Sequence, residues 1–120
     1  MKTIVLAGLG LTLSIGVAVT VFAADNAKKS VTGTLEDSYC YGLMGAKGAS
    51  HQKCAIECAK SGIPVALVEK GTGKVWVVLP AKNASPYPDD VISKMEDEVT
   101  ITGKTANKGG VNFITAEQVK

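Results

Sequence analysis

The chain has 120 residues, which is enough for one domain and no more. Its 13 basic residues are all lysines, they stand against 11 acidic residues, and the formal net charge is +2. Proteins that bind nucleic acid use a basic, arginine-bearing surface, so we expect no nucleic-acid partner for this chain. The composition is otherwise that of an ordinary globular protein, neither disordered nor low in complexity.

The amino-terminal segment is typical of an export signal. Lys2 gives it a positive start, and residues 3–20 form an apolar run. Val21 and Ala23 then place small residues at the −3 and −1 positions of a cleavage site, so residues 1–23 are predicted to be a signal peptide that is cleaved before Ala24. The alternative is an uncleaved anchor, because an apolar stretch of about 20 residues is just long enough to span a bilayer. With cleavage we expect a periplasmic or secreted protein with no membrane attachment.

The remaining chain is predicted to be a short flexible segment, residues 24–29, followed by a single domain over residues 30–120. Residues 31–36 alternate in polarity and are rich in β-branched side chains, which predicts a strand with a bulge at Gly33.

A glycine-rich stretch over residues 37–49 is predicted to be a loop. Ser50 is a suitable N-cap for a helix over residues 51–60, and Gly62 is placed to end that helix. Further strands are predicted over residues 63–69, 74–79, 99–104 and 111–115, with a short helix over 89–97 and turns at 70–73 and 106–110.

This order of elements predicts a mainly β fold with two short helices. Five strands with a helix before the fourth are typical of a small OB-like barrel, here with a loop–helix insertion after the first strand. Gly33 and Gly103 occupy corresponding places in the first and fourth strands, where a small barrel must bend. The alternative is an open α+β sheet.

The residues best suited to bind a metal or to react are concentrated in one cluster. Three cysteines and the only histidine fall within 19 residues. His51, Cys54 and Cys58 lie within an arc of about 60° on the predicted helix, while Cys40 comes from the preceding loop. Three thiolates and one imidazole form a tetrahedral donor set for zinc, and thiolates also suit Cu(I). We therefore predict that Cys40, His51, Cys54 and Cys58 bind one zinc or Cu(I) ion per chain.

Two neighbours are expected to support this site. Asp37 lies three residues before Cys40 and is predicted to form a hydrogen bond to one of the ligands from outside the coordination sphere. Met44 is expected to lie beside the site, where its thioether sulfur would favour copper.

Other interpretations of the cysteines stay open. An exported protein is in a compartment where disulfides form, so Cys40 could pair with Cys54 or Cys58 and leave one thiol over. The protein would then be a thiol–disulfide redox protein with an exported protein as its partner, or a disulfide-stapled interaction module. Simple packing of small side chains on the sheet is a third interpretation. No arrangement typical of a hydrolase is present, and no enzymatic activity is predicted.

These motifs also carry a resemblance. Asp37 to Cys40 reads D-x-x-C, and His51 to Ala59 reads H-x-x-C-A-x-x-C-A. With G-I-P-V at residues 62–65 and V-T-I-T-G-K at 99–104, the chain resembles a family of small exported bacterial proteins of uncharacterised function. The resemblance implies an exported location, an OB-like β domain and a retained Cys–His cluster, and it implies no activity.

Overall fold

The computed structural model describes residues 27–120. The predicted signal peptide, its cleavage site before Ala24 and most of the segment 24–29 lie outside the described residues. Within residues 27–120, no helix is both long and apolar enough to cross a membrane.

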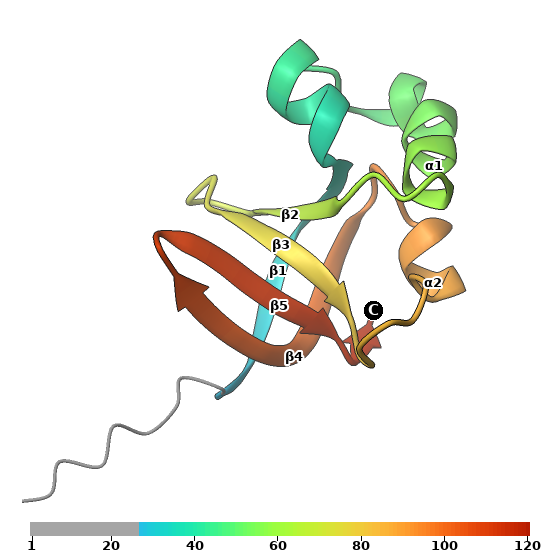
Figure 1. The fold of residues 1–120 in the computed structure, drawn as a ribbon. Helices are drawn as coiled ribbons and strands as arrows, with labels where there is room; N and C mark the ends of the chain where they lie inside the picture. The colour runs from blue at the N-terminus through green and yellow to red at the C-terminus, as the bar shows by residue number, and fades with distance from the viewer. Residues whose placement is uncertain (1–26) are drawn as a thin grey trace, which may run out of the picture.

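Five strands close into a barrel (Figure 1). They follow the order β1-β2-β3-β5-β4, and β1 also pairs with β4, which completes the circle. All neighbours are antiparallel except β3 and β5, which are parallel. This confirms the mainly β, OB-like barrel and not the open sheet. The strands are β1 (Lys28–Asp37), β2 (Val65–Glu69), β3 (Val75–Pro80), β4 (Glu98–Lys108) and β5 (Val111–Ala116), with a short sixth strand, β6 (Gln118–Val119), that pairs with β4 and was not predicted.

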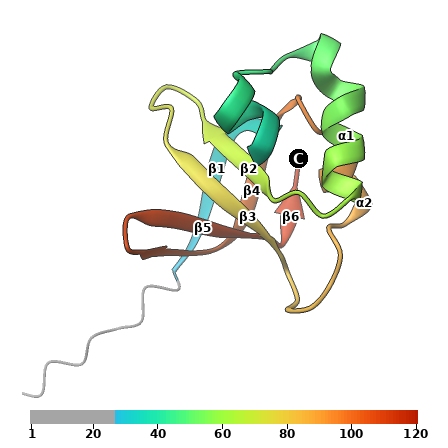
Figure 2. The ribbon, with the colours of Figure 1, turned by 45° about the horizontal axis from the view of Figure 1, so that its top comes forward.

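The helical segments gather at one end of this barrel. Figures 1 and 2 both show α1 (Gln52–Lys60) beside α2 (Asp89–Ile92), with the insertion after β1 arching over the same end. The insertion consists of a π-helix, η1 (Cys40–Met44), a 3₁₀ turn, η2 (Ala49–His51), and then α1. The predicted loop–helix insertion is thus present, and it is more regular than expected.

The prediction of an irregular loop over residues 37–49 is wrong for its first half. The chain continues from β1 into η1, and Gly45 ends this π-helix with its N–H bonded to the Cys40 carbonyl. Gly45 has φ +65° and Gly48 has φ +94°. Gly45 thus ends η1 and Gly48 precedes η2, each at a position with a positive φ that glycine adopts readily. The glycines bound these two helical turns and do not prevent regular structure.

The start of α1 also differs from the prediction. Ser50 is not an N-cap, because it lies inside η2, and His51 takes the N-cap position without a side-chain capping bond. The imidazole of His51 is instead bonded to Asp37, which is 14 residues away in the chain. A tertiary hydrogen bond has replaced the local cap.

The end of α1 is as predicted. Gly62 has φ +92° and donates its N–H to the Ala59 carbonyl at 3.2 Å. Ile63 donates to the Cys58 carbonyl at 3.0 Å, which completes a Schellman motif. This cap fixes where the chain leaves the helix and enters β2.

Three boundaries in the chain are shifted. β1 begins at Lys28, two residues before the expected domain start, because it pairs with β4 from Lys28 onward. α2 ends at Ile92, not near residue 97, and a series of turns follows it. β4 runs to Lys108, so the turn before β5 is only Gly109-Gly110 rather than residues 106–110.

Two glycines are needed for close approach of the strands. The pairing of β1 with β4 continues unbroken through Gly33, so the predicted bulge there is wrong. A Cβ atom at Gly33 would overlap the Val68 carbonyl, and one at Gly103 would overlap the Thr115 carbonyl. The absence of a side chain lets both strands bend tightly enough to close a small barrel.

The core fills the barrel and extends under the insertion. α1 contributes Ala55 and Ala59, which are buried against the strands, while Trp76 is buried on β3. The fully buried aliphatic and thioether side chains are Leu35, Val65, Leu67, Val78, Val91, Met95, Ile101 and Ile114.

We expect Gly103→Ala to destabilise the domain, because its methyl group overlaps backbone rather than a movable side chain. The expected loss is about 1–3 kcal/mol, and each kcal/mol lowers the melting temperature of a domain this size by about 4–8 °C. Gly42→Ala is the control, since a Cβ there meets nothing within 4 Å. Equal thermal melting curves for the two variants would contradict the prediction.

Candidate metal centre

A single buried carboxylate organises the insertion. Asp37 ends β1 and its side chain is fully buried. Its Oδ1 accepts the N–H of Cys40 at 2.8 Å, and its Oδ2 lies 2.9 Å from Nε2 of His51. Burial alone would raise the pKa of Asp37, but these hydrogen bonds outweigh it and hold the pKa below its usual value. One ionised side chain therefore holds the π-helix and the start of α1 together.

This bond also sets the tautomer of His51. An ionised carboxylate only accepts hydrogen bonds, so Nε2 of a neutral His51 must carry the proton that is donated to Asp37. The lone pair is then on Nδ1. Histidines that bind metals are oriented in the same way, with one ring nitrogen bonded to a carboxylate and the other free for the ion.

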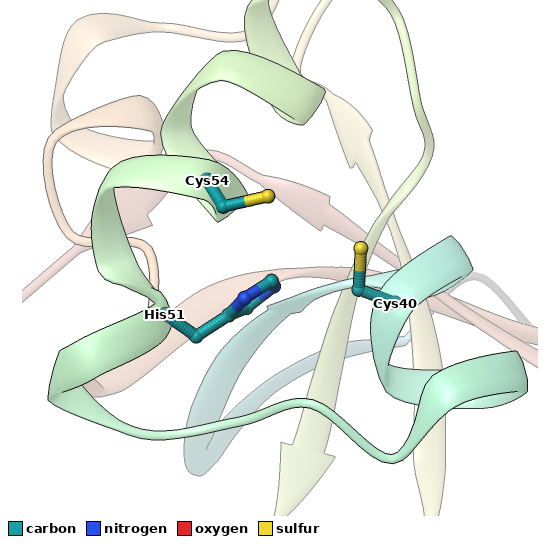
Figure 3. A group of neighbouring side chains, drawn as sticks. All are labelled: Cys40, His51 and Cys54. Atoms are coloured by element: carbon teal, nitrogen blue, oxygen red, sulfur yellow. The ribbon is translucent and has the colours of Figure 1, made fainter.

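The predicted ligands come together from two segments. Ligand atoms of Cys40, His51 and Cys54 all lie within 4.8 Å of one another, and so do those of Asp37, Cys40 and Cys58. Figure 3 shows the thiols of Cys40, on the π-helix, and Cys54, on α1, facing each other above the imidazole ring. The four residues and Asp37 thus lie close enough to hold a metal ion. None of the three cysteines forms a disulfide.

The thiols differ in their environments. Cys40 is buried, Cys58 is half-buried and Cys54 is exposed. Burial, followed by the neighbouring Asp37, raises the pKa of Cys40 to about 12. Burial also raises the pKa of Cys58, with smaller contributions from Asp37 and Cys54. Without an ion the Cys40 thiol is therefore protonated at neutral pH, and a bound cation must displace its proton.

Packing of α1 on the barrel does not depend on the cysteines of this helix. Ala55 and Ala59 make the contact of α1 with the barrel core, so Cys54 and Cys58 are not needed to fill that contact. Met44, in contrast, is 68% exposed at the last residue of the π-helix. Its side chain lies at the surface and not among the buried donors.

Two buried carboxylates next to this cluster were missed by the sequence analysis. Glu96 has Oε1 at 4.0 Å from Nε2 of His51, and its Oε2 accepts the N–H of Gly48 at 2.6 Å. Glu36 precedes Asp37 and is also buried. Burial, and then the nearby Glu96, raise the pKa of Glu36 to about 8.

Sequence signals for these carboxylates are weak. Glu36 alternates on β1 with the exposed Thr32, a pattern that predicts an exposed side chain, yet it is buried beside Glu96. Glu96 has φ +69°, a conformation that costs a residue with a side chain about 1–2 kcal/mol. Its N–H is bonded to the Leu35 carbonyl at 2.7 Å, which holds it in place. Nothing in the local sequence indicates that contact.

Comparison with known proteins gave no relatives. No protein-family model, no curated protein and no solved structure matches the chain. The functional conclusions therefore depend on the geometry of the cluster.

We expect the three thiols of the reduced, metal-free protein to be alkylated in the order of their exposure. Cys54 should react first and Cys40 last, roughly a hundredfold more slowly at neutral pH, because Cys40 is buried and protonated. Raising the pH should speed the reaction at Cys40 continuously, since its thiolate fraction grows up to about pH 12. Timed alkylation followed by peptide mass spectrometry measures this order, and equal rates at Cys40 and Cys54 would contradict it.

Proposed function

We propose that this protein is an exported metal-binding protein in which Cys40, His51, Cys54 and Cys58 hold one zinc or Cu(I) ion. The main support is the convergence of every cysteine and the only histidine of the chain on one place, from the π-helix and from α1.

The donor set favours a structural or storage role rather than catalysis. Three thiolates and one imidazole fill a tetrahedral ion completely, and catalytic zinc keeps one position open for water or substrate. The hydrogen bond from His51 to Asp37 supplies the outer support that metal-binding histidines commonly have. Because the ligands come from two segments of the insertion, binding of the ion would hold the π-helix against the start of α1.

The two candidate metals differ in how much their binding depends on His51 as a ligand. Cu(I) is a soft ion that thiolates satisfy well, whereas zinc is borderline and readily accepts imidazole nitrogen as a ligand. Loss of the imidazole should therefore weaken zinc binding more than Cu(I) binding.

A thiol–disulfide redox protein is the second candidate function. It is favoured by one observation, the exposed Cys54 whose sulfur lies within 4.8 Å of the sulfur of buried Cys40. The raised pKa of Cys40 makes it a poor attacking thiol, so the exposed Cys54 would have to be the nucleophile.

The metal hypothesis predicts about one equivalent of zinc or copper in protein trapped with alkylating agent at lysis. It also predicts three alkylatable thiols after denaturation in chelator without reductant. His51→Ala should lower zinc affinity at least tenfold, because it removes the fourth donor. Lys53→Ala, on an exposed position of α1, is the matched control and should leave affinity unchanged.

The disulfide interpretations predict a different result in the same experiment. They expect one free thiol, no stoichiometric metal and no effect of His51→Ala. That outcome would reject the metal hypothesis and favour either the redox protein or the disulfide-stapled interaction module.

Export is the other part of the proposal. It is supported by the apolar residues 3–20, by the small residues Val21 and Ala23 at the −3 and −1 positions of a cleavage site, and by the resemblance to small exported bacterial proteins. We expect the exported protein to begin at Ala24, and intact-mass measurement of the periplasmic or secreted fraction tests this. A mass that includes residues 1–23, found in the membrane fraction, would indicate an anchor instead.

A further inference from the structure

A second set of possible metal donors adjoins the thiols, and it shares His51 and Asp37 with their surroundings. Ligand atoms of Asp37, His51 and Glu96 all lie within 4.8 Å of one another. The side chains of Asp37 and Glu96 are fully buried, and that of His51 is 13% exposed. Glu36, also buried, adjoins Glu96. These donors are oxygen and nitrogen, not sulfur.

Two oxygens in this group have no partner. Within residues 27–120, Glu36 Oε2 and Glu96 Oε1 are buried side-chain atoms that accept no hydrogen bond. Native proteins leave few buried polar atoms in this condition, because each costs the full loss of its hydration. The unpartnered Glu96 oxygen is the one that faces His51, at 4.0 Å from Nε2.

The charge of the group is also unbalanced. In the described part of the chain, no lysine forms an ion pair with Glu36, Asp37 or Glu96. With Glu36 protonated, as its pKa of about 8 implies at neutral pH, a protonated His51 would neutralise only one of the two remaining carboxylates, Asp37 and Glu96. An ion in the thiol site does not help, because three thiolates around a divalent ion leave a net charge of −1. Buried carboxylates without a cation are strongly unfavourable.

We propose that Asp37, Glu96 and His51 form a second metal site, for a divalent cation of the Mn²⁺ or Fe²⁺ class, with Glu36 supporting it. Two carboxylates and one imidazole are the donors that such ions prefer, in contrast to the soft thiolate set. The cation would bind the free oxygen of Glu96 and Nε2 of His51, and it would supply the missing positive charge. The Nε2 proton that Asp37 accepts without the cation would move to Nδ1, so His51 would serve one of the two sites at a time. The site lies under the glycine-flanked connection at Gly48, whose N–H already orients the other Glu96 oxygen.

The proposal is tested with Mn²⁺ as the probe for this site and Co²⁺ as the probe for the thiols. Bound Mn²⁺ is measured by the loss of the electron paramagnetic resonance signal of the free ion, in reduced protein without other metals. Bound Co²⁺ is measured by its thiolate charge-transfer absorption. We expect one Mn²⁺ per chain, and at least tenfold weaker Mn²⁺ binding in Glu96→Gln. Glu98→Gln, which makes the same charge change at an exposed position, should bind Mn²⁺ like the parent.

The two probes separate this proposal from the thiol site. Glu96→Gln should keep the Co²⁺–thiolate absorption, which also shows that the variant is folded, and Cys54→Ser should lose that absorption but keep Mn²⁺ binding. Equal Mn²⁺ binding in Glu96→Gln and Glu98→Gln, or none in the parent, would overturn the second site. A proton shared by Glu36 and Glu96 would then account for the unpartnered oxygens. Absence of the Co²⁺–thiolate absorption in the parent would instead reject the thiol site alone.

Discussion

The buried carboxylate of Asp37 is the constraint on which the functional end of the molecule depends. An ionised group inside a protein must be satisfied by donors, and the donors here are the Cys40 N–H and the His51 imidazole. The first starts the π-helix and the second fixes the beginning of α1. The hydrogen bonds of this one side chain therefore bring together two segments that a glycine-rich connection joins in the chain.

The barrel supplies the place where this can happen. Gly33 and Gly103 let β1 and β4 bend closely past their neighbours, so the end of β1 reaches the turn that precedes β4. There the Leu35 carbonyl holds the backbone of Glu96 in a left-handed conformation. The fold thus brings a carboxylate from residue 96 to a histidine from residue 51, and it accepts a strained backbone to do so.

Two kinds of possible metal donor, thiols and carboxylates, lie around His51. Soft sulfur donors come from the π-helix and α1, and hard carboxylate donors come from β1 and the turn before β4. Both sets are rich in potential negative charge and poor in positive charge, so both are better suited to cations than to any anionic ligand. Asp37 and His51 each lie within 4.8 Å of donors of both kinds.

The sequence by itself determined the features that depend on near neighbours. The β-branched runs predicted the five strands, Gly62 predicted the end of α1, and the helical spacing placed His51, Cys54 and Cys58 near one another. These follow from local backbone geometry, which the adjacent residues fix. The tertiary structure alone decided the rest: the π-helix at Cys40, the short sixth strand, and the burial of Glu36 and Glu96. Whether a carboxylate is buried depends on segments distant in the chain that cover it, and the local sequence pattern does not predict those contacts.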